Sequence, residues 1–153
     1  MTVPSIDTQN PDLLKTQALE NEGLVAAVTR DLKIVDKINQ RLPTTDKANV
    51  TMGQRVLAMI LNGLGFTNDR LYLVPRFFQN KPVDRLIGPG IESEHLNDDA
   101  LGRCLDAIAT YGTTRLFFDM AFEIGTEQGL LGKSSHLDTT SLTLQGNYLI
   151  MKQ

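Results

Sequence analysis

A short segment near the C-terminal end of the sequence carries the residues best suited to chemistry. Residues 136–144 are His-Leu-Asp-Thr-Thr-Ser-Leu-Thr-Leu, and Gln-Gly-Asn follows at 145–147. β-Branched residues recur there with period-two alternation, which predicts a strand followed by a turn. Asp138 would lie in the middle of that strand, where an unpaired carboxylate is costly to bury. Two interpretations fit the spacing: an Asp at the exposed end of an edge strand, or a metal-binding carboxylate held on a rigid strand.

A second segment, residues 70–85, concentrates positive charge. Its acidic content is limited to Asp84, so its local charge is +3 in a chain whose net charge is −3. Aromatic residues are interleaved with the cations, which are Arg70, Arg76, Lys81 and Arg85. One interpretation is a half-buried helix whose aromatic side chains face the core while its cations are solvated. The other is a surface that contacts phosphates, since Arg and Lys supply most of the affinity of proteins for the DNA backbone.

The segment around Asp138 resembles the first catalytic strand of bacterial DDE transposases of the insertion-sequence type. In those enzymes an RNase H-like core places its first metal-binding Asp in a Leu-Asp-[Ser/Thr]-[Ser/Thr]-Ser context, which matches residues 137–141. The preceding region resembles the N-terminal domain of one branch of that group, through residues 53–66, 71–91 and 94–103. The resemblance extends over about residues 20–148 and lacks everything beyond the first catalytic strand.

The resemblance implies a transposase N-terminal fragment whose inherited role is DNA binding in transposition. Asp138 would be a vestigial first metal-binding Asp in an incomplete metal site, because the second Asp and the Glu of the family lie further along the chain. Two-metal phosphoryl transfer needs several carboxylates, so we expect no catalysis by this polypeptide alone. No stably bound cofactor is expected, although the full-length family uses Mg²⁺ or Mn²⁺. The DNA-binding residues would be Arg70, Arg76, Lys81, Arg85 and Arg103.

Two other functions stay open at this point. The chain could be a stand-alone protein-interaction module that regulates a full-length transposase by hetero-oligomerisation, using the edge of the predicted hairpin for strand pairing. It could also form an active nuclease if several subunits together supply the missing metal ligands. The expected partners are therefore DNA at the element ends, a second copy in a homodimer, or a full-length transposase.

Composition narrows the alternatives further. With 153 residues and 41% hydrophobic content, the chain can bury one good core. Its acidic balance provides no global field that attracts nucleic acid, although a local basic patch can coexist with it. The single Cys fits a reducing compartment, and neither a signal peptide nor a membrane-spanning apolar segment is visible, so we expect a cytoplasmic protein. His95 and His136, the only histidines, lack partners at zinc spacing.

The predicted fold is mainly α, with about five to seven helices that end in a short β-hairpin at the start of an RNase H-like core. Residues 1–20 are expected to be a flexible arm, and residues 21–132 a helical domain of the DNA-binding or dimerisation type. Residues 133–153 would form the first strand or hairpin of the incomplete core. On the first helix, Leu24, Val25, Ala27 and Val28 form a short predicted apolar face, and a turn at 31–33 leads into the second helix. This pair resembles a DNA-binding helix-turn-helix, although the same arrangement is common in ordinary helical packing.

Local signals predict how the later helices begin and which faces they bury. Thr51 and Asn97 are expected N-caps, and the position of Asp98 and Asp99 in a first helical turn explains them without a catalytic role. Pro75 should kink or restart the helix in which it lies. Leu101, Cys104, Leu105 and Ile108 form one predicted apolar face. Thr113 is expected to cap the last helix, whose buried face would be Leu116, Phe117, Met120, Ala121 and Ile124.

Overall fold

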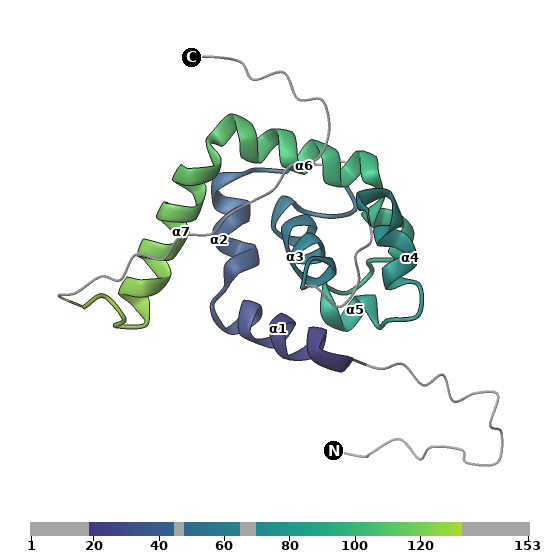
Figure 1. Ribbon diagram of the computed structural model, residues 1–153, viewed down its shortest axis with the longest axis horizontal. Coiled ribbons are helices and arrows are strands. Elements are labelled where there is room, and N and C mark those ends of the chain that lie inside the picture. The colour runs from purple at the N-terminus through teal and green to yellow at the C-terminus, as the bar shows by residue number, and fades with distance from the viewer. Residues whose placement is uncertain (1–18, 45–47, 65–69, 133–153) are drawn as a thin grey trace, which may run out of the picture.

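The computed structural model describes residues 19–44, 48–64 and 70–132 of the chain (Figure 1). Within these ranges all regular structure is helical, so the prediction of a mainly α fold is confirmed. Residues 1–18 of the predicted arm, the predicted hairpin and Asp138 lie outside the described residues, and Glu20, the last residue of the predicted arm, begins the first helix. The elements are α1 (Glu20–Asp31), α2 (Ile34–Arg41), α3 (Met52–Asn62), the 3₁₀ turn η2 (Leu71–Leu73), α4 (Val74–Phe78), α5 (Val83–Leu86), the 3₁₀ turn η3 (Ser93–Leu96), α6 (Asp98–Tyr111) and α7 (Thr113–Glu127).

The first two helices are joined by the predicted tight turn. Lys33 adopts a left-handed conformation there, with φ of 53°, and α2 begins directly after it. The predicted apolar face of α1 is confirmed only at Val25, which packs against the main core, and is wrong at Leu24, which is 71% exposed, and at Val28, which is also exposed. The buried face instead contains Glu22, Ala26 and Thr29. One carboxylate oxygen of Glu22 is paired with Lys81, and the Thr29 hydroxyl donates to the carbonyl of Val25, whereas the other Glu22 oxygen is buried without a hydrogen-bond partner among the described residues.

Helix α3 lies in the middle of the described helices, surrounded by α1, α2, α6 and the α4–α5 segment (Figure 1). It starts with a capping box in which Thr51 and Gln54 bond to each other's backbone N–H, which confirms the predicted N-cap. Gly53 allows the backbones of α2 and α3 to approach closely, because a Cβ there would collide with the carbonyl oxygen of Val35. The main core forms around the buried α3 residues Leu57, Ala58 and Leu61.

The segment after α3 supplies the rest of the main core. Pro75 lies in the first turn of α4, where its missing N–H costs nothing, so the expected restart of the helix is confirmed. Phe78 is fully buried and meets Phe77 edge to face, with ring centroids 4.8 Å apart. Further core side chains are Val74, Val83, Leu86, Ile87, Ile91, Leu96 and Leu101. The hydrophobic residues of this segment therefore hold α4 and α5 against α3.

Helix α6 begins as predicted and buries a narrower face than predicted. The side chain of Asn97 accepts from the N–H of Ala100, while Asp98 and Asp99 occupy the first turn. Cys104 is buried, in agreement with the prediction. Leu105 is exposed, which contradicts the predicted apolar face. The reason is that α3 covers only one side of α6, the side on which Leu101 and Cys104 lie.

Helix α7 projects along the outer edge of the molecule beside α2 (Figure 1). Its N-cap is Gly112, with φ of 100°, rather than the predicted Thr113, which is the first residue of the helix. A second, smaller core forms where Leu116 and Met120 of α7 pack on Ile38 of α2 and on its C-cap residue Leu42. The other predicted core positions on α7, Phe117 and Ala121, are exposed because no described element covers that side.

The described helices are all too short or too polar to cross a membrane.

Candidate functional site

Four of the predicted DNA-binding cations are exposed, and they come from successive elements. Arg70 precedes η2, Arg76 lies on α4, Arg85 on α5 and Arg103 on α6. Helices α4 and α5 lie at the same end of the molecule, away from α7 (Figure 1). Among the residues that the structure describes, no ion pair involves any of these four side chains. Their guanidinium groups are therefore available to an external anion.

Lys81, the fifth predicted DNA-binding cation, is engaged within the fold. Its ammonium group lies 2.9 Å from a carboxylate oxygen of Glu22, a residue of α1 that is only 2% exposed. The same group lies 4.8 Å from the centre of the Phe77 ring, which is a cation–π geometry. Lys81 thus joins α1 to the segment after α4. A phosphate would have to compete with a buried carboxylate for this ammonium group.

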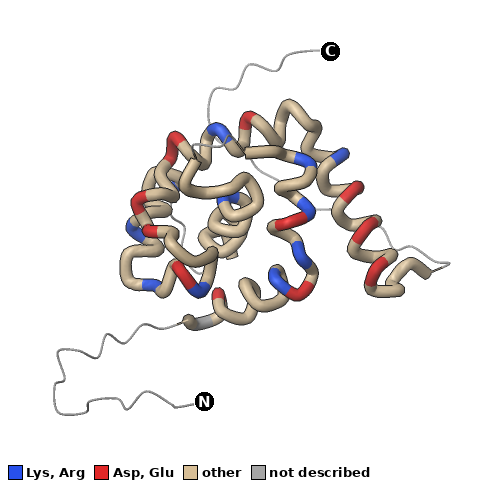
Figure 2. The backbone as a smooth tube through the Cα atoms, turned by 180° about the vertical axis from the view of Figure 1, so that it is seen from behind, with Lys and Arg blue, Asp and Glu red and all other residues tan. Residues whose placement is uncertain are grey.

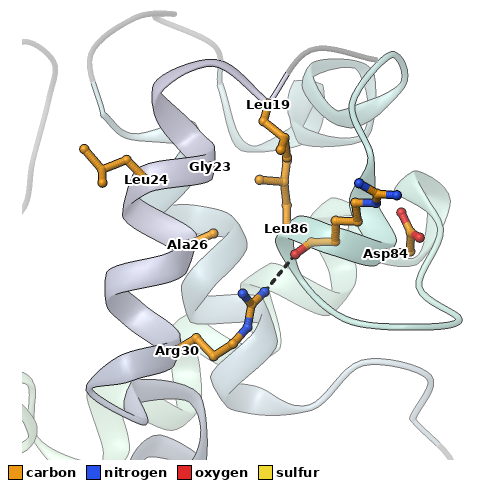
Figure 3. Close-up of a pocket in the computed structure, with 8 residues that line it drawn as sticks. Leu19, Gly23, Leu24, Ala26, Arg30, Asp84 and Leu86 are labelled. Atoms are coloured by element: carbon orange, nitrogen blue, oxygen red, sulfur yellow. Dashed lines mark hydrogen bonds between the residues drawn. The ribbon is translucent and has the colours of Figure 1, made fainter. Parts of the chain in front are cut away.

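A pocket of about 570 Å³ lies between α1 and α5 (Figure 3). Arg30, in the last turn of α1, donates from Nη2 to the carbonyl oxygen of Arg85 over 2.9 Å. The pocket is otherwise lined mainly by apolar or small residues, together with Asp84 and Arg85. Sequence reasoning missed Arg30, because a basic residue in the last turn of a helix is ordinarily explained by the helix dipole. The structure brings Arg30 next to a predicted residue that is 55 positions away.

An ion-pair cluster connects α2 to α7. Lys37 is almost completely buried and lies 2.8 Å from Glu123 and 2.6 Å from Glu127, while Arg41 contacts the other oxygen of Glu123. Basic positions of α2 face acidic positions of α7 in Figure 2. Hydrogen bonds from Lys37 and Arg41 lower the pKa of Glu123, and the bonds to Glu123 and Glu127 raise the pKa of Lys37. These cations stabilise the α2–α7 contact and are not available to a ligand.

The outer side of α7 carries an aromatic stripe, which we define as Phe117, Phe118, Ala121 and Phe122. Phe117 is 75% exposed and Phe118 is 64% exposed. The rings of Phe118 and Phe122 stack at a centroid distance of 6.0 Å. Large exposed apolar patches on a soluble domain commonly mark interaction surfaces. The aromatic stripe is the second candidate site, and sequence reasoning assigned part of it to the core.

Asp138, the predicted metal ligand, lies outside the described residues. Within residues 19–44, 48–64 and 70–132, no group of three or more His, Cys, Asp or Glu side chains is arranged to hold a metal ion. Asp98 and Asp99 occupy the first turn of α6, as the dipole explanation predicts. His95 uses Nδ1 to accept a hydrogen bond from the N–H of Glu92.

Comparison with known proteins identifies a family and no individual relative. Neither the curated proteins nor the solved structures contain a match to this chain. Residues 14–122 match the family model of a domain of unknown function, DUF4277. The matched region contains α1 to α6 and most of α7, including the exposed arginines and the aromatic stripe. Because the match extends over more than two thirds of the 153 residues, the chain belongs to the DUF4277 family.

Proposed function

We propose that this chain is the N-terminal, DNA-binding part of a DDE-type insertion-sequence transposase, and that it acts in the cytoplasm without catalytic activity of its own. The resemblance of residues 53–66, 71–91 and 94–103 to that group supports the proposal. The structural observation that supports it best is the state of Arg70, Arg76 and Arg85. These side chains are exposed and lack ion pairs within the described residues, whereas Lys37, Arg41 and Lys81 are paired.

The proposed interaction is with the phosphate backbone at the element ends. A guanidinium group can donate two parallel hydrogen bonds to a phosphate, and such contacts position a protein on DNA without reading its sequence. Arg30, which is hydrogen-bonded to the backbone of Arg85, would add a fourth cation to this end of the molecule. Asp138 takes no catalytic part in the proposal, because one carboxylate cannot hold a pair of metal ions.

The test is binding of the purified chain to duplex DNA from the element ends, measured by fluorescence anisotropy between about 50 and 200 mM salt. Replacing Arg70, Arg76 and Arg85 together with Gln should weaken binding and reduce the slope of log K against log salt by roughly three, since each phosphate contact contributes about 0.9. The matched control is Arg115→Gln, which removes another exposed arginine, located on α7. An unchanged slope in the triple variant, or no binding by the wild-type chain at low salt, would contradict the proposal.

A second candidate function is association with another copy of the same domain, either in this chain or within a longer transposase. The aromatic stripe favours it. The stripe residues themselves carry no charge. Of the neighbouring carboxylates, Asp119 accepts from the Tyr111 hydroxyl and lies 3.8 Å from Arg115, and Glu123 is paired with Lys37 and Arg41 of α2. An uncharged stripe can meet its own copy without repulsion between like charges, as the same-patch contact of a two-fold dimer requires.

The available apolar area is near the minimum for such a dimer. Leu131 folds back over Gly125 of α7, and both Leu130 and Leu131 are exposed, so they extend the stripe. Six partly exposed phenylalanine rings from two copies would bury on the order of 800 Å². The leucines bring the total close to the ~1,200 Å² at which specific interfaces begin. We therefore expect a weak dimer that forms at micromolar or higher concentration.

Sedimentation-velocity centrifugation over a range of protein concentrations tests this second candidate. The double variant Phe118→Ser/Phe122→Ser should remain monomeric at concentrations at which the wild-type chain associates. Leu24→Ser is the matched control, because Leu24 is equally exposed but lies on α1. A wild-type chain that stays monomeric, or an equal response to the control substitution, would rule out association through α7.

A further inference from the structure

We propose that the pocket between α3 and the start of α6 is an oxyanion-binding site that takes a phosphate group, with Arg55 and Arg103 as its principal ligands. The pocket measures about 360 Å³ and is bordered by the residues that precede α3, by the N-terminal half of α3 and by the η3–α6 segment. It is distinct from the exposed arginines of α4 and α5 on which the proposed function is based.

Arg55 provides the first reason. Arg55 is only 6% exposed, yet its buried Nε has no hydrogen-bond partner. Its Nη1 makes only a weak contact, at 3.6 Å from the sulfur of Met52. Within the described residues no carboxylate pairs with this guanidinium group. A guanidinium stays protonated in proteins, so Arg55 is a buried positive charge without a counter-charge. Buried charges are normally paired, because removing them from water is costly.

The surroundings of Arg55 add a second positive charge and no counter-charge. Arg103 of α6 lines the same pocket, and its charge opposes the protonated form of Arg55, so burial and this repulsion together lower the Arg55 pKa. A Cys104 thiolate would raise the Arg55 pKa again, but burial raises the thiol pKa of Cys104 and its Sγ donates to the carbonyl of Met52, so at neutral pH the neutral thiol supplies no counter-charge. Two positive charges therefore share a pocket that contains no thiolate at neutral pH. An anion bound between Arg55 and Arg103 would offset both the cost of burying the Arg55 charge and the repulsion between the two arginines.

A third donor is available to such an anion. His95 lines the pocket and its Nδ1 accepts the N–H of Glu92 over 3.1 Å, so the neutral ring carries its proton on Nε2. Glu94 is the acidic residue of the lining; it is exposed and forms no ion pair with a described residue. The Asn97 side chain already has hydrogen-bond partners, because its Oδ1 accepts from the N–H of Ala100 and its Nδ2 donates to the carbonyl of Glu94. The lining therefore offers the guanidinium groups of Arg55 and Arg103 and the Nε2–H of His95 as donors, with Glu94 as its acidic residue.

The volume of the pocket and the type of donors favour phosphate as the ligand. The pocket has room for on the order of ten water molecules, at about 30 Å³ each. Arginine guanidinium groups bind phosphate through paired charge-assisted hydrogen bonds. Both a free phosphate ion and a phosphodiester of the DNA backbone have the required oxygens. A DNA phosphodiester in this pocket would add a further contact to the proposed DNA binding, so this form of the proposal rests on the proposed function. Binding of a free phosphate ion does not depend on that function.

The experiment uses the full chain and inorganic phosphate in a chloride buffer at constant ionic strength, with titration calorimetry and thermal unfolding as readouts. We expect saturable phosphate binding that raises the unfolding temperature by a few degrees. Arg103→Gln removes an exposed ligand without disturbing the core, and it should weaken binding roughly tenfold or more. Arg55→Met should abolish binding. Arg115→Gln is the matched control and should bind phosphate normally.

The two sources of phosphate are distinguished by competition with a short DNA duplex. Displacement of phosphate by DNA, together with weaker DNA binding by Arg103→Gln, would identify a backbone phosphodiester as the ligand. Phosphate binding that DNA does not displace would identify a free anion, and it would leave the role of Arg70, Arg76 and Arg85 as a separate question. No saturable effect of phosphate, or one that persists unchanged in Arg103→Gln and Arg55→Met, would overturn the proposed site. If Arg55→Met fails to fold, Arg103→Gln decides the matter.

Discussion

The α2–α7 and α3–α6 contacts both enclose a basic residue from the first half of the chain, and they treat it in opposite ways. At α2–α7, buried Lys37 has two carboxylate partners, and Arg41 shares one of them. At α3–α6, buried Arg55 faces a second arginine and a neutral thiol. Burial alone therefore does not reveal the role of a cation. The presence or absence of a counter-charge separates a side chain that stabilises the fold from one that is available to a ligand.

Lys81 is another cation with a carboxylate partner, and its substitution should cause the largest loss of stability. Lys81→Met would leave the carboxylate of Glu22 buried without its ammonium partner, and we expect it to lower the free energy of unfolding by on the order of 3 kcal/mol. Urea denaturation near pH 7 measures the change. The double variant Glu22→Gln/Lys81→Met should recover part of the loss, because it removes both charges. A loss in the double variant equal to or larger than that in the single variant would show that the pair itself is not responsible.

The α2–α7 cluster should make stability depend on pH. The lowered pKa of Glu123 means that its contribution is present above its ordinary pKa of 4.5 and is lost as the pH falls through the folded-state value. The raised pKa of Lys37 means that its contribution is present below 10.5 and is lost as the pH rises through the folded-state value. Glu123→Gln should be less stable than wild type at neutral pH and should approach it in acid. Parallel acid-denaturation curves for the two proteins would contradict this assignment.

Arg55 should respond in the opposite direction to the paired cations. In buffer without phosphate, Arg55→Met should be neutral or should raise the free energy of unfolding by about 1 kcal/mol, because an unpaired buried charge is replaced by an apolar side chain of similar length. Urea denaturation in chloride buffer tests this. A strong destabilisation would place Arg55 with the paired cations and would remove the contrast between the two contacts.

The smallest effect is expected at Arg115, which is 73% exposed in its side chain and lies 3.8 Å from Asp119 one helical turn away. Such surface pairs contribute little, so Arg115→Gln should change the free energy of unfolding by less than about 0.5 kcal/mol. The change should disappear in high salt, because exposed charges are screened. A larger, salt-independent loss would show that the contact of Arg115 with the Tyr111 ring matters more than its charge.

The sequence predicted well those features that depend on neighbouring residues. The caps at Thr51 and Asn97, the restart at Pro75 and the turn before α2 are all local, and the structure confirms them. Each of these signals acts over one helical turn, so it does not depend on how the helices later pack. The prediction of a mainly α fold depends on the same local periodicity.

Features that depend on tertiary contacts could not be predicted from the sequence. Periodicity placed Phe117 in the core, but it cannot say whether another element covers that side of α7. Lys81 belonged by composition to a basic segment, while its partner Glu22 lies 59 positions away. The lack of a counter-charge near Arg55 likewise becomes visible only when all neighbouring helices are in place. Charge counts along the chain therefore predicted a basic region without distinguishing its structural cations from its available ones.

The ion pairs between α2 and α7 also bear on the order in which the chain folds. Lys37 is separated from Glu123 and Glu127 by 86 and 90 positions, whereas the Asn39 side chain that accepts the Gly53 N–H bridges only 14. Closing a longer loop has a higher entropic cost, so contacts between α2 and α3 should form before α7 docks. Substitutions in the α2–α3 contact should then slow folding, while those at Leu116 should mainly accelerate unfolding. During synthesis α7 is also the last described helix to be made, so α2 presents Lys37 and Arg41 before their carboxylate partners exist.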